Sequence, residues 1–119
     1  MNLVVDASVI VKWYVDEVDS KIAHRILLDS RFTFCAPAHA FGEVGSALAA
    51  NIRRGILARS VLPEIGRRLV GSIASYPIDT LLPAAVNIAL DIGSTVYDAF
   101  YIALAVELDT CVATADAIG

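Results

Sequence analysis

Short runs of apolar residues alternate along this chain with longer segments in which apolar positions recur every three or four residues. The short runs predict buried strands at 2–5, 32–36, 76–79 and 111–114. The longer segments predict helices at 8–16, 20–28, 37–53, 60–74, 83–91 and 96–108. Because strands that alternate with helices favour a parallel sheet covered on both faces, the pattern predicts an α/β fold.

Prolines and glycines mark the ends of several predicted helices. Pro37 fits the first turn of the third helix, and Pro63 fits the first turn of the fourth. Gly55 follows the third helix, and Gly93 separates the last two. No linker or repeat interrupts this order, so we expect residues 1–119 to form a single domain.

The composition indicates a well-filled core. Hydrophobic residues make up 57% of the chain and charged residues 18%, against about 25% in ordinary soluble domains. The longest uncharged runs, 32–42 and 80–90, are shorter than the roughly 20 residues of a membrane-spanning helix. No signal peptide is visible at the N-terminus. We therefore expect a cytoplasmic protein that buries apolar surface against a second copy or a partner.

The net charge of −4 argues against a protein that coats nucleic acids. All nine Lys and Arg residues lie at or before Arg68, so the rest of the chain is acidic. This balance still allows an enzyme that offsets local acidic charge with a divalent metal ion. Cys35 and Cys111 lie in short apolar segments without metal-binding spacing, and we interpret both as reduced core residues.

Four acidic residues lie among apolar or small neighbours: Asp6, Glu43, Asp98 and Asp116. Asp6 and Asp116 follow the first and last predicted strands, so a parallel sheet would bring both to one edge. Glu43 is the one charged residue in 32–52. Asp98 opens a helix that is apolar on every side, so we expect it to be buried.

Each acid also has a simpler interpretation. Asp6 fits a helix cap, Glu43 a solvent-exposed helix edge, Asp98 a capping box with Thr95, and Asp116 an ordinary loop. Taken together they favour a shared site, because converging carboxylates repel one another unless a cation lies between them. Oxygen ligands without a His or Cys cluster select Mg²⁺ or Mn²⁺.

Four segments of the chain resemble PIN-domain toxins of the VapC type: 5–13, 37–48 with the following Arg53-Arg54-Gly55, 97–105 and 114–116. The resemblance implies a three-layer α/β/α sandwich around a central parallel sheet. It also implies a Mg²⁺- or Mn²⁺-dependent endoribonuclease that is the toxin of a type II toxin–antitoxin pair. By position, Asp6, Glu43, Asp98 and Asp116 would be the catalytic and metal-binding acids, supported by the hydroxyls of Ser8 and Thr114.

The resemblance further implies an RNA substrate, a small antitoxin protein and a homodimer. Family members usually continue past the last motif into another helix and strand, so we expect a shortened C-terminus at Gly119. Arg53, Arg54 and Arg59 are candidates for contacts with RNA phosphates, although a solvated basic surface explains them equally well.

Two other interpretations compete with a nuclease. A PIN-like module that binds a partner without catalysis would fit the apolar composition and the short C-terminus. A phosphatase of the haloacid dehalogenase kind requires a second Asp two residues after Asp6, where this chain has Ser8. His24 and His39 show no ligand spacing, so we assign them structural roles.

Overall fold

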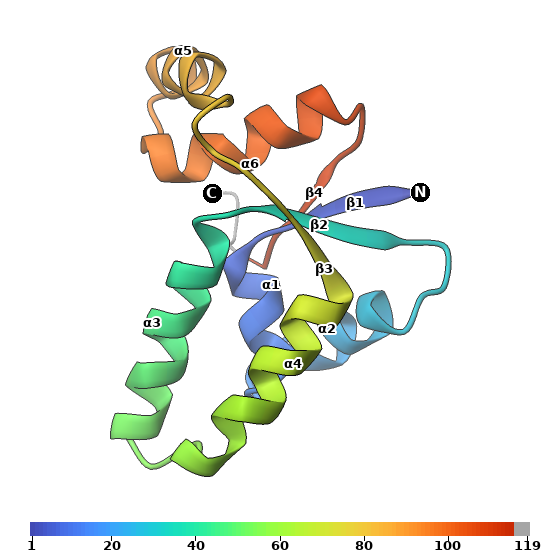
Figure 1. The fold of residues 1–119 in the computed structure, drawn as a ribbon, viewed down its shortest axis with the longest axis vertical. Coiled ribbons are helices and arrows are strands. Elements are labelled where there is room, and N and C mark those ends of the chain that lie inside the picture. The colour runs from blue at the N-terminus through green and yellow to red at the C-terminus, as the bar shows by residue number, and fades with distance from the viewer. Residues whose placement is uncertain (116–119) are drawn as a thin grey trace.

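Four parallel strands form the centre of the computed structural model, which describes residues 1–115 (Figure 1). The strands are β1 (Asn2–Val5), β2 (Thr33–Pro37), β3 (Ile73–Tyr76) and β4 (Val112–Ala113), and their order is β3-β2-β1-β4. All three pairings are parallel. In β1, Val4 and Val5 are fully buried, as expected for a strand covered on both faces.

Helices cover the sheet on both sides, so the predicted three-layer α/β/α arrangement is confirmed. They are α1 (Ala7–Lys12), α2 (Ser20–Leu27), α3 (Ala40–Arg53), the 3₁₀ helix η1 (Arg59–Val61), α4 (Leu62–Ser72), α5 (Leu82–Ile92) and α6 (Val96–Glu107). In Figure 1, α5 and α6 lie above the strands and α1 to α4 lie below them.

The segment around Pro37 differs from the prediction. Pro37 is the last residue of β2 rather than part of a helix, and it lies opposite Tyr76 in β3. The backbone N–H of Ala38 donates to the Tyr76 carbonyl (2.8 Å), and α3 begins only at Ala40. Proline has no N–H to donate, and it therefore fits the end of a strand. The third strand also begins at Ile73, three residues earlier than predicted, because Ile73 pairs with Phe34 and is buried.

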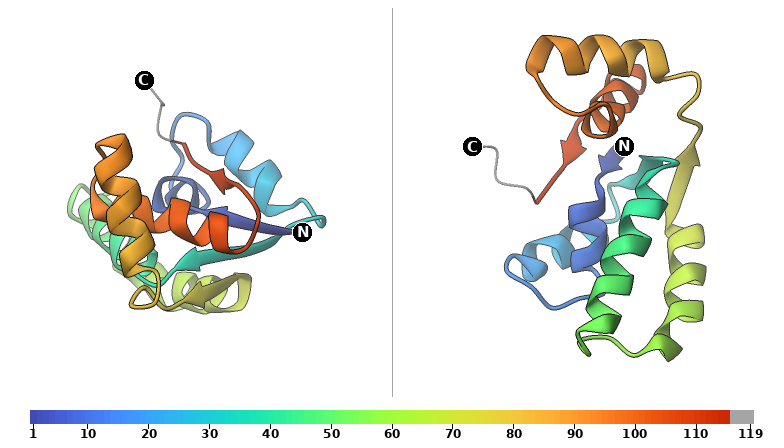
Figure 2. Two further views of the ribbon diagram at one scale, coloured as in Figure 1. Left: turned by 90° about the horizontal axis from the view of Figure 1, so that it is seen from above. Right: turned by 90° about the vertical axis from the view of Figure 1, so that its left-hand side faces the viewer.

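Helix α6 is the most buried helix of the layer above the sheet in Figure 1. Its residues Ala99, Phe100, Ala103, Leu104 and Ala105 are all buried. Figure 2 (left) shows α5 lying across α6 rather than against the sheet. Within residues 1–115 no single helix is long and apolar enough to span a membrane. Helices α5 and α6 reach that length only as a pair, and the pair is bent by 114° at the break between them.

The two cysteines have different surroundings. Cys35 is buried in β2, as predicted, whereas Cys111 is exposed just before β4, so the prediction that it belongs to the core is wrong. Cys111 precedes a strand of only two residues at the edge of the sheet, where no further strand of the described chain covers it. Both thiols are free.

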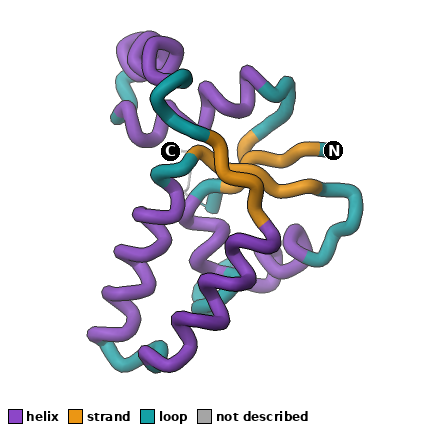
Figure 3. The backbone as a smooth tube through the Cα atoms, viewed as in Figure 1, coloured by secondary structure: helices purple, strands orange, loops and turns teal. Residues whose placement is uncertain are grey.

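The chain adds strands to the sheet on both sides of β1. From β1 the chain adds β2 and then β3 on one side, and β4 pairs with β1 on the other (Figure 3). In open α/β sheets, ligands bind beside the carboxyl ends of the strands at such a change of side. Asp6 follows β1 at this place, and its backbone N–H donates to the Ala113 carbonyl of β4 (3.2 Å).

Candidate active site

Asp6 lies at the carboxyl end of β1 and begins helix α1. Its Oδ1 accepts hydrogen bonds from the backbone N–H of Val9 (3.2 Å) and from the Ser8 hydroxyl (2.5 Å). The side chain therefore caps α1, as the simpler interpretation predicted. Asp6 is nevertheless only 9% exposed, and both of these hydrogen bonds end on the same oxygen. Capping accordingly leaves Oδ2 available for a further role.

Ser8 connects Asp6 to the last strand. While its hydroxyl donates to Asp6, its oxygen accepts the backbone N–H of Ala115 (3.0 Å). This geometry suits the supporting role that was predicted for Ser8. Thr114, the other predicted hydroxyl, is exposed between β4 and Ala115. The predicted acid Asp116 lies outside the described residues, so its role stays a prediction.

Glu43, in the first turn of α3, is bound by a tyrosine from a distant element. The hydroxyl of Tyr101 in α6 donates to Glu43 Oε1 at 2.5 Å. His39 Nε2 lies 3.4 Å from the same oxygen and 2.9 Å from the Tyr97 carbonyl. The Glu43 side chain is 40% exposed. One oxygen of this carboxylate is therefore held by neighbours while the group still reaches solvent.

Tyr101 contacts one of the two acids at the carboxyl edge of the sheet and is influenced by the charge of the other. Burial is the main cause that raises the pKa of its phenol, and the hydrogen bond and negative charge of Glu43 raise it further. The charge of Asp6 acts in the same direction, whereas a hydrogen bond with the Ala7 backbone opposes it. The phenol is therefore neutral at physiological pH and donates a hydrogen bond to Glu43. Its hydroxyl is bonded to Glu43 and is within range of the Asp6 charge.

Asp98 lies one helical turn before Tyr101, on the same side of α6. Thr95 Oγ1 accepts its backbone N–H (3.1 Å), which confirms the predicted cap. The expectation that Asp98 is buried is wrong, because its side chain is exposed. Burial in α6 begins only at Ala99, since the first turn of the helix extends beyond the strands. Asp98 is therefore accessible to a ligand at the same edge.

A family model described as "PIN domain" matches residues 3–118 of the chain. This protein belongs to the PIN-domain family. Its sequence is 34% identical over 120 residues to Ribonuclease VapC3 of Pyrobaculum aerophilum, an alignment that covers 98% of this chain and 90% of the relative. The relative confirms the VapC type that the motifs predicted.

A solved structure supports the PIN fold independently. The fold matches the crystal structure of Mycobacterium tuberculosis VapC20, described as a toxin that cleaves the sarcin-ricin loop, with a TM-score of 0.74. The match covers 96% of this chain and 91% of that one at 17% sequence identity. At 17% identity this comparison establishes the fold of the chain alone.

The donors at the carboxyl edge of this PIN domain suit a hard divalent cation. Mg²⁺ in proteins is usually bound by one or two carboxylates together with water and substrate phosphates. Asp6 and Glu43, each with one oxygen outside the hydrogen bonds described above, provide such a pair. Residues 1–115 contain no group of three His, Cys, Asp or Glu side chains close enough to hold an ion. The predicted cluster of four acids therefore stays a prediction.

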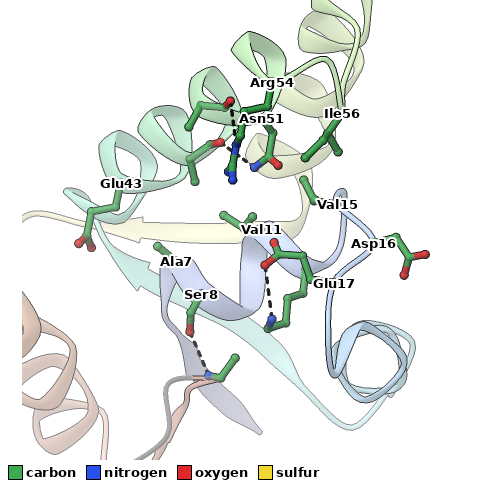
Figure 4. Close-up of a pocket in the computed structure, with 14 residues that line it drawn as sticks. Ala7, Ser8, Val11, Val15, Asp16, Glu17, Glu43, Asn51, Arg54 and Ile56 are labelled. Carbon is green, nitrogen blue, oxygen red and sulfur yellow. Dashed lines mark hydrogen bonds and ion pairs between the residues drawn. The ribbon is translucent and has the colours of Figure 1, made fainter.

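A pocket of about 590 Å³ opens beside Glu43 in this PIN domain, between α1 and α3 (Figure 4). Ser8 and Ala115 line it near the acids, and the basic side chains Lys12 and Arg54 line it farther along. Arg54 uses its Nε to contact the Ala50 carbonyl (3.4 Å). Of the three arginines proposed for RNA contacts, Arg54 lines this pocket, whereas Arg53 and Arg59 are exposed outside it.

Two residues of the PIN-domain site were missed from the sequence. Tyr101 sits in an apolar helix, where nothing in the pattern shows that its hydroxyl faces Glu43. His39 was assigned a structural role, although its spacing of four residues from Glu43 is a signal that would have found it, because side chains so spaced meet on a helix.

Proposed function

We propose that this chain is a metal-dependent endoribonuclease of the cytoplasm and the toxin of a type II toxin–antitoxin pair. The observation that carries the proposal is that Asp6 follows β1 and Glu43, in the first turn of α3, follows the neighbouring strand β2, at the carboxyl edge of the sheet. The name of the relative Ribonuclease VapC3 and the toxin title of the VapC20 structure support RNA as the substrate. A catalytically inactive module has no such specific support.

In this proposal Asp6 and Glu43, together with Asp98 and Asp116, hold Mg²⁺ or Mn²⁺. The cation would neutralise the charge that grows on the scissile phosphate and would activate the attacking water. Ser8 keeps the Asp6 carboxylate in place through its 2.5 Å hydrogen bond and ties it to Ala115, the residue before Asp116. Thr114 would act beside Asp116 in the same supporting way.

The pocket between α1 and α3 is the surface that we propose for the RNA backbone. Lys12 and Arg54 provide positive charge along the pocket, which the acids Asp16 and Glu17 also line. Lys12 is partly neutralised by Glu17, whose Oε2 lies 3.7 Å from the Lys12 Nζ. Phosphate contacts of this kind position RNA without reading its sequence. Arg53 and Arg59 lie farther away and would contact only a longer substrate.

The proposal also includes two protein partners. One is a small antitoxin, for which the relatives described as VapC proteins are the support. The other is a second copy of this chain. Helices α5 and α6 expose several large apolar side chains, among them Leu82, Leu90 and Val106. Burying them in a homodimer would remove apolar surface from water.

The test is cleavage of structured RNAs by purified protein with Mg²⁺, Mn²⁺ or EDTA. Asp6→Asn and Asp98→Asn are expected to lower cleavage by at least about 100-fold, because each removes a negative charge from the metal site. Asn is as good a helix cap as Asp, so Asp6→Asn should keep its melting temperature. Asp91→Asn, an exposed acid at the end of α5, is the matched control and should cleave normally.

Three results would contradict the proposal. Cleavage that continues in EDTA would exclude a role for the metal ion in the reaction. Full activity in both Asn variants would exclude a role for Asp6 and Asp98. Wild-type protein that binds Mn²⁺ tightly but cleaves none of the RNAs would favour the inactive binding module instead.

A further inference from the structure

We propose that Tyr101 is a positioning residue that holds the Glu43 carboxylate in the orientation needed to bind the metal ion. The inference rests on the proposed function, because it assigns Tyr101 a task within that site. The task is carried by the hydroxyl alone, through its hydrogen bond to Glu43 Oε1.

The bond joins α3 to α6, which are also linked by the contacts of His39 with α6. Glu43 lies in the first turn of α3 below the sheet, and Tyr101 lies in α6 above it, 58 residues later. At 2.5 Å the bond is short, as expected when a hydroxyl donates to an ionised carboxylate. It therefore fixes a side chain of one helical layer with respect to the other layer.

Glu43 needs such a bond because its own surroundings do not hold it. Its side chain is 40% exposed, and the last torsion of a glutamate rotates over a broad range. The Tyr101 hydroxyl donates to Oε1, and His39 Nε2, which bonds the Tyr97 carbonyl, lies 3.4 Å from the same oxygen. With that oxygen occupied, the carboxylate presents Oε2, and its plane is set by Tyr101.

Tyr101 is rigid enough for this task. It is 5% exposed, and its ring packs 4.9 Å from the His39 ring, which in turn lies 5.1 Å from Phe100. Asp98 lies one turn earlier on the same helix. A single buried helix therefore sets the place of Asp98 directly and that of Glu43 through the tyrosine.

A tyrosine can also be buried merely to fill space, and the two roles are separable. The ring fills the core, whereas the hydroxyl contacts Glu43. Tyr101→Phe removes only the hydroxyl. Tyr97→Phe is the matched control, because Tyr97 is on the same helix but is 64% exposed, and its contacts with His39 come from its ring and its backbone carbonyl.

The experiment measures Mn²⁺ affinity by calorimetry in the absence of RNA, and kcat and KM for RNA cleavage. Tyr101→Phe is expected to weaken Mn²⁺ binding or lower kcat by about 10- to 100-fold, as is typical when a partner of a metal ligand is lost. KM for RNA should change little, because Tyr101 itself does not line the proposed RNA surface. Tyr97→Phe should match the wild type in Mn²⁺ affinity, kcat and KM.

A double-mutant cycle with Glu43→Gln shows whether Tyr101 acts through Glu43. If it does, adding Tyr101→Phe to Glu43→Gln costs no further Mn²⁺ affinity. Because each step of the cycle is compared within one background, a general loss of stability in the Phe variant cancels.

Wild-type Mn²⁺ affinity and kcat in Tyr101→Phe would overturn the inference while leaving the proposed function intact. So would strictly additive losses in the cycle. Failure of the proposed function has a different signature: wild-type protein itself would show neither Mn²⁺ binding nor cleavage, and the inference would fall with it.

Discussion

The two thiols of this chain differ in access to solvent, which gives a direct test of the packing around β2. Burial raises the pKa of the Cys35 thiol, whose Sγ donates to the Leu3 carbonyl at 3.5 Å. Cys111 is exposed. In the folded protein, Ellman's reagent should modify Cys111 within minutes and Cys35 only as fast as the protein unfolds. Rapid modification of a Cys111→Ser variant would contradict this packing.

Asp29 gives a prediction about pH. Hydrogen bonds from the Arg31 side chain and backbone lower the pKa of Asp29 from 3.8 to about 2. Because the pKa is lower in the folded state, the pair stabilises the fold above about pH 4, and this contribution is lost as the pH falls toward 2. An NMR titration should find the low pKa in the wild type and a higher pKa in Arg31→Gln, still below 3.8 because the backbone hydrogen bond remains. Arg25→Gln, with its positive charge elsewhere, should leave the Asp29 value unchanged.

Single residues of the site were predicted only as far as local pattern determines them. Asp6 was placed correctly because an apolar strand directly precedes it, and the cap at Thr95 followed from spacing alone. The exposure of Asp98 depends on how far α6 extends past the sheet, which no local pattern encodes. The direction of the Tyr101 hydroxyl likewise depends on the packing of two distant helices.

The turn between α5 and α6 depends on one glycine. Gly93 has φ 73°, a conformation in which a side chain is strained, whereas Gly66 has an ordinary helical backbone in α4. Neither position is crowded, since a Cβ atom at either would meet nothing within 4 Å. Gly93→Ala should therefore lower the free energy of unfolding by about 1–2 kcal/mol. Gly66→Ala should raise it by about 0.5–1 kcal/mol.

Chemical denaturation of the two variants measures both changes against the wild type. The opposite signs are the decisive feature, because a generic sensitivity to added methyl groups would move both in the same direction. Equal stability of Gly93→Ala and the wild type would mean that the α5–α6 turn adopts another backbone conformation.

Helices and strands were predicted well where a regular pattern of apolar residues extends over the element. They were predicted poorly where pairing between strands determines the boundary. The helical pattern of 96–108 and the strand 2–5 agree closely with α6 and β1. By contrast, β3 was placed too late, because the apolar pattern of α4 runs without a break into Ile73, and only its pairing with Phe34 ends the helix. Pro37 was misplaced for a related reason, since proline suits both the start of a helix and the end of a strand.

At the scale of the molecule, α5 exposes an apolar surface. Leu82, Val86 and Leu90 recur every four residues and are 48%, 37% and 77% exposed. We expect this side of α5 to be part of the proposed dimer, so Leu90→Glu should shift the protein to the monomer in sedimentation equilibrium. Val70→Glu alters an equally exposed valine of α4 and should leave the dimer intact. A monomeric wild type, or dissociation by Val70→Glu, would exclude this surface.

The pairing of β1 with β4 joins nearly the first residues of the chain to nearly the last. Ala113 and Ala115, which bind Asp6 and Ser8, are synthesised 107 residues after them. A growing polypeptide therefore carries Asp6 beside an open strand edge until β4 has been made. The candidate site would in this way stay unassembled until the stretch of message that encodes β4 has been read.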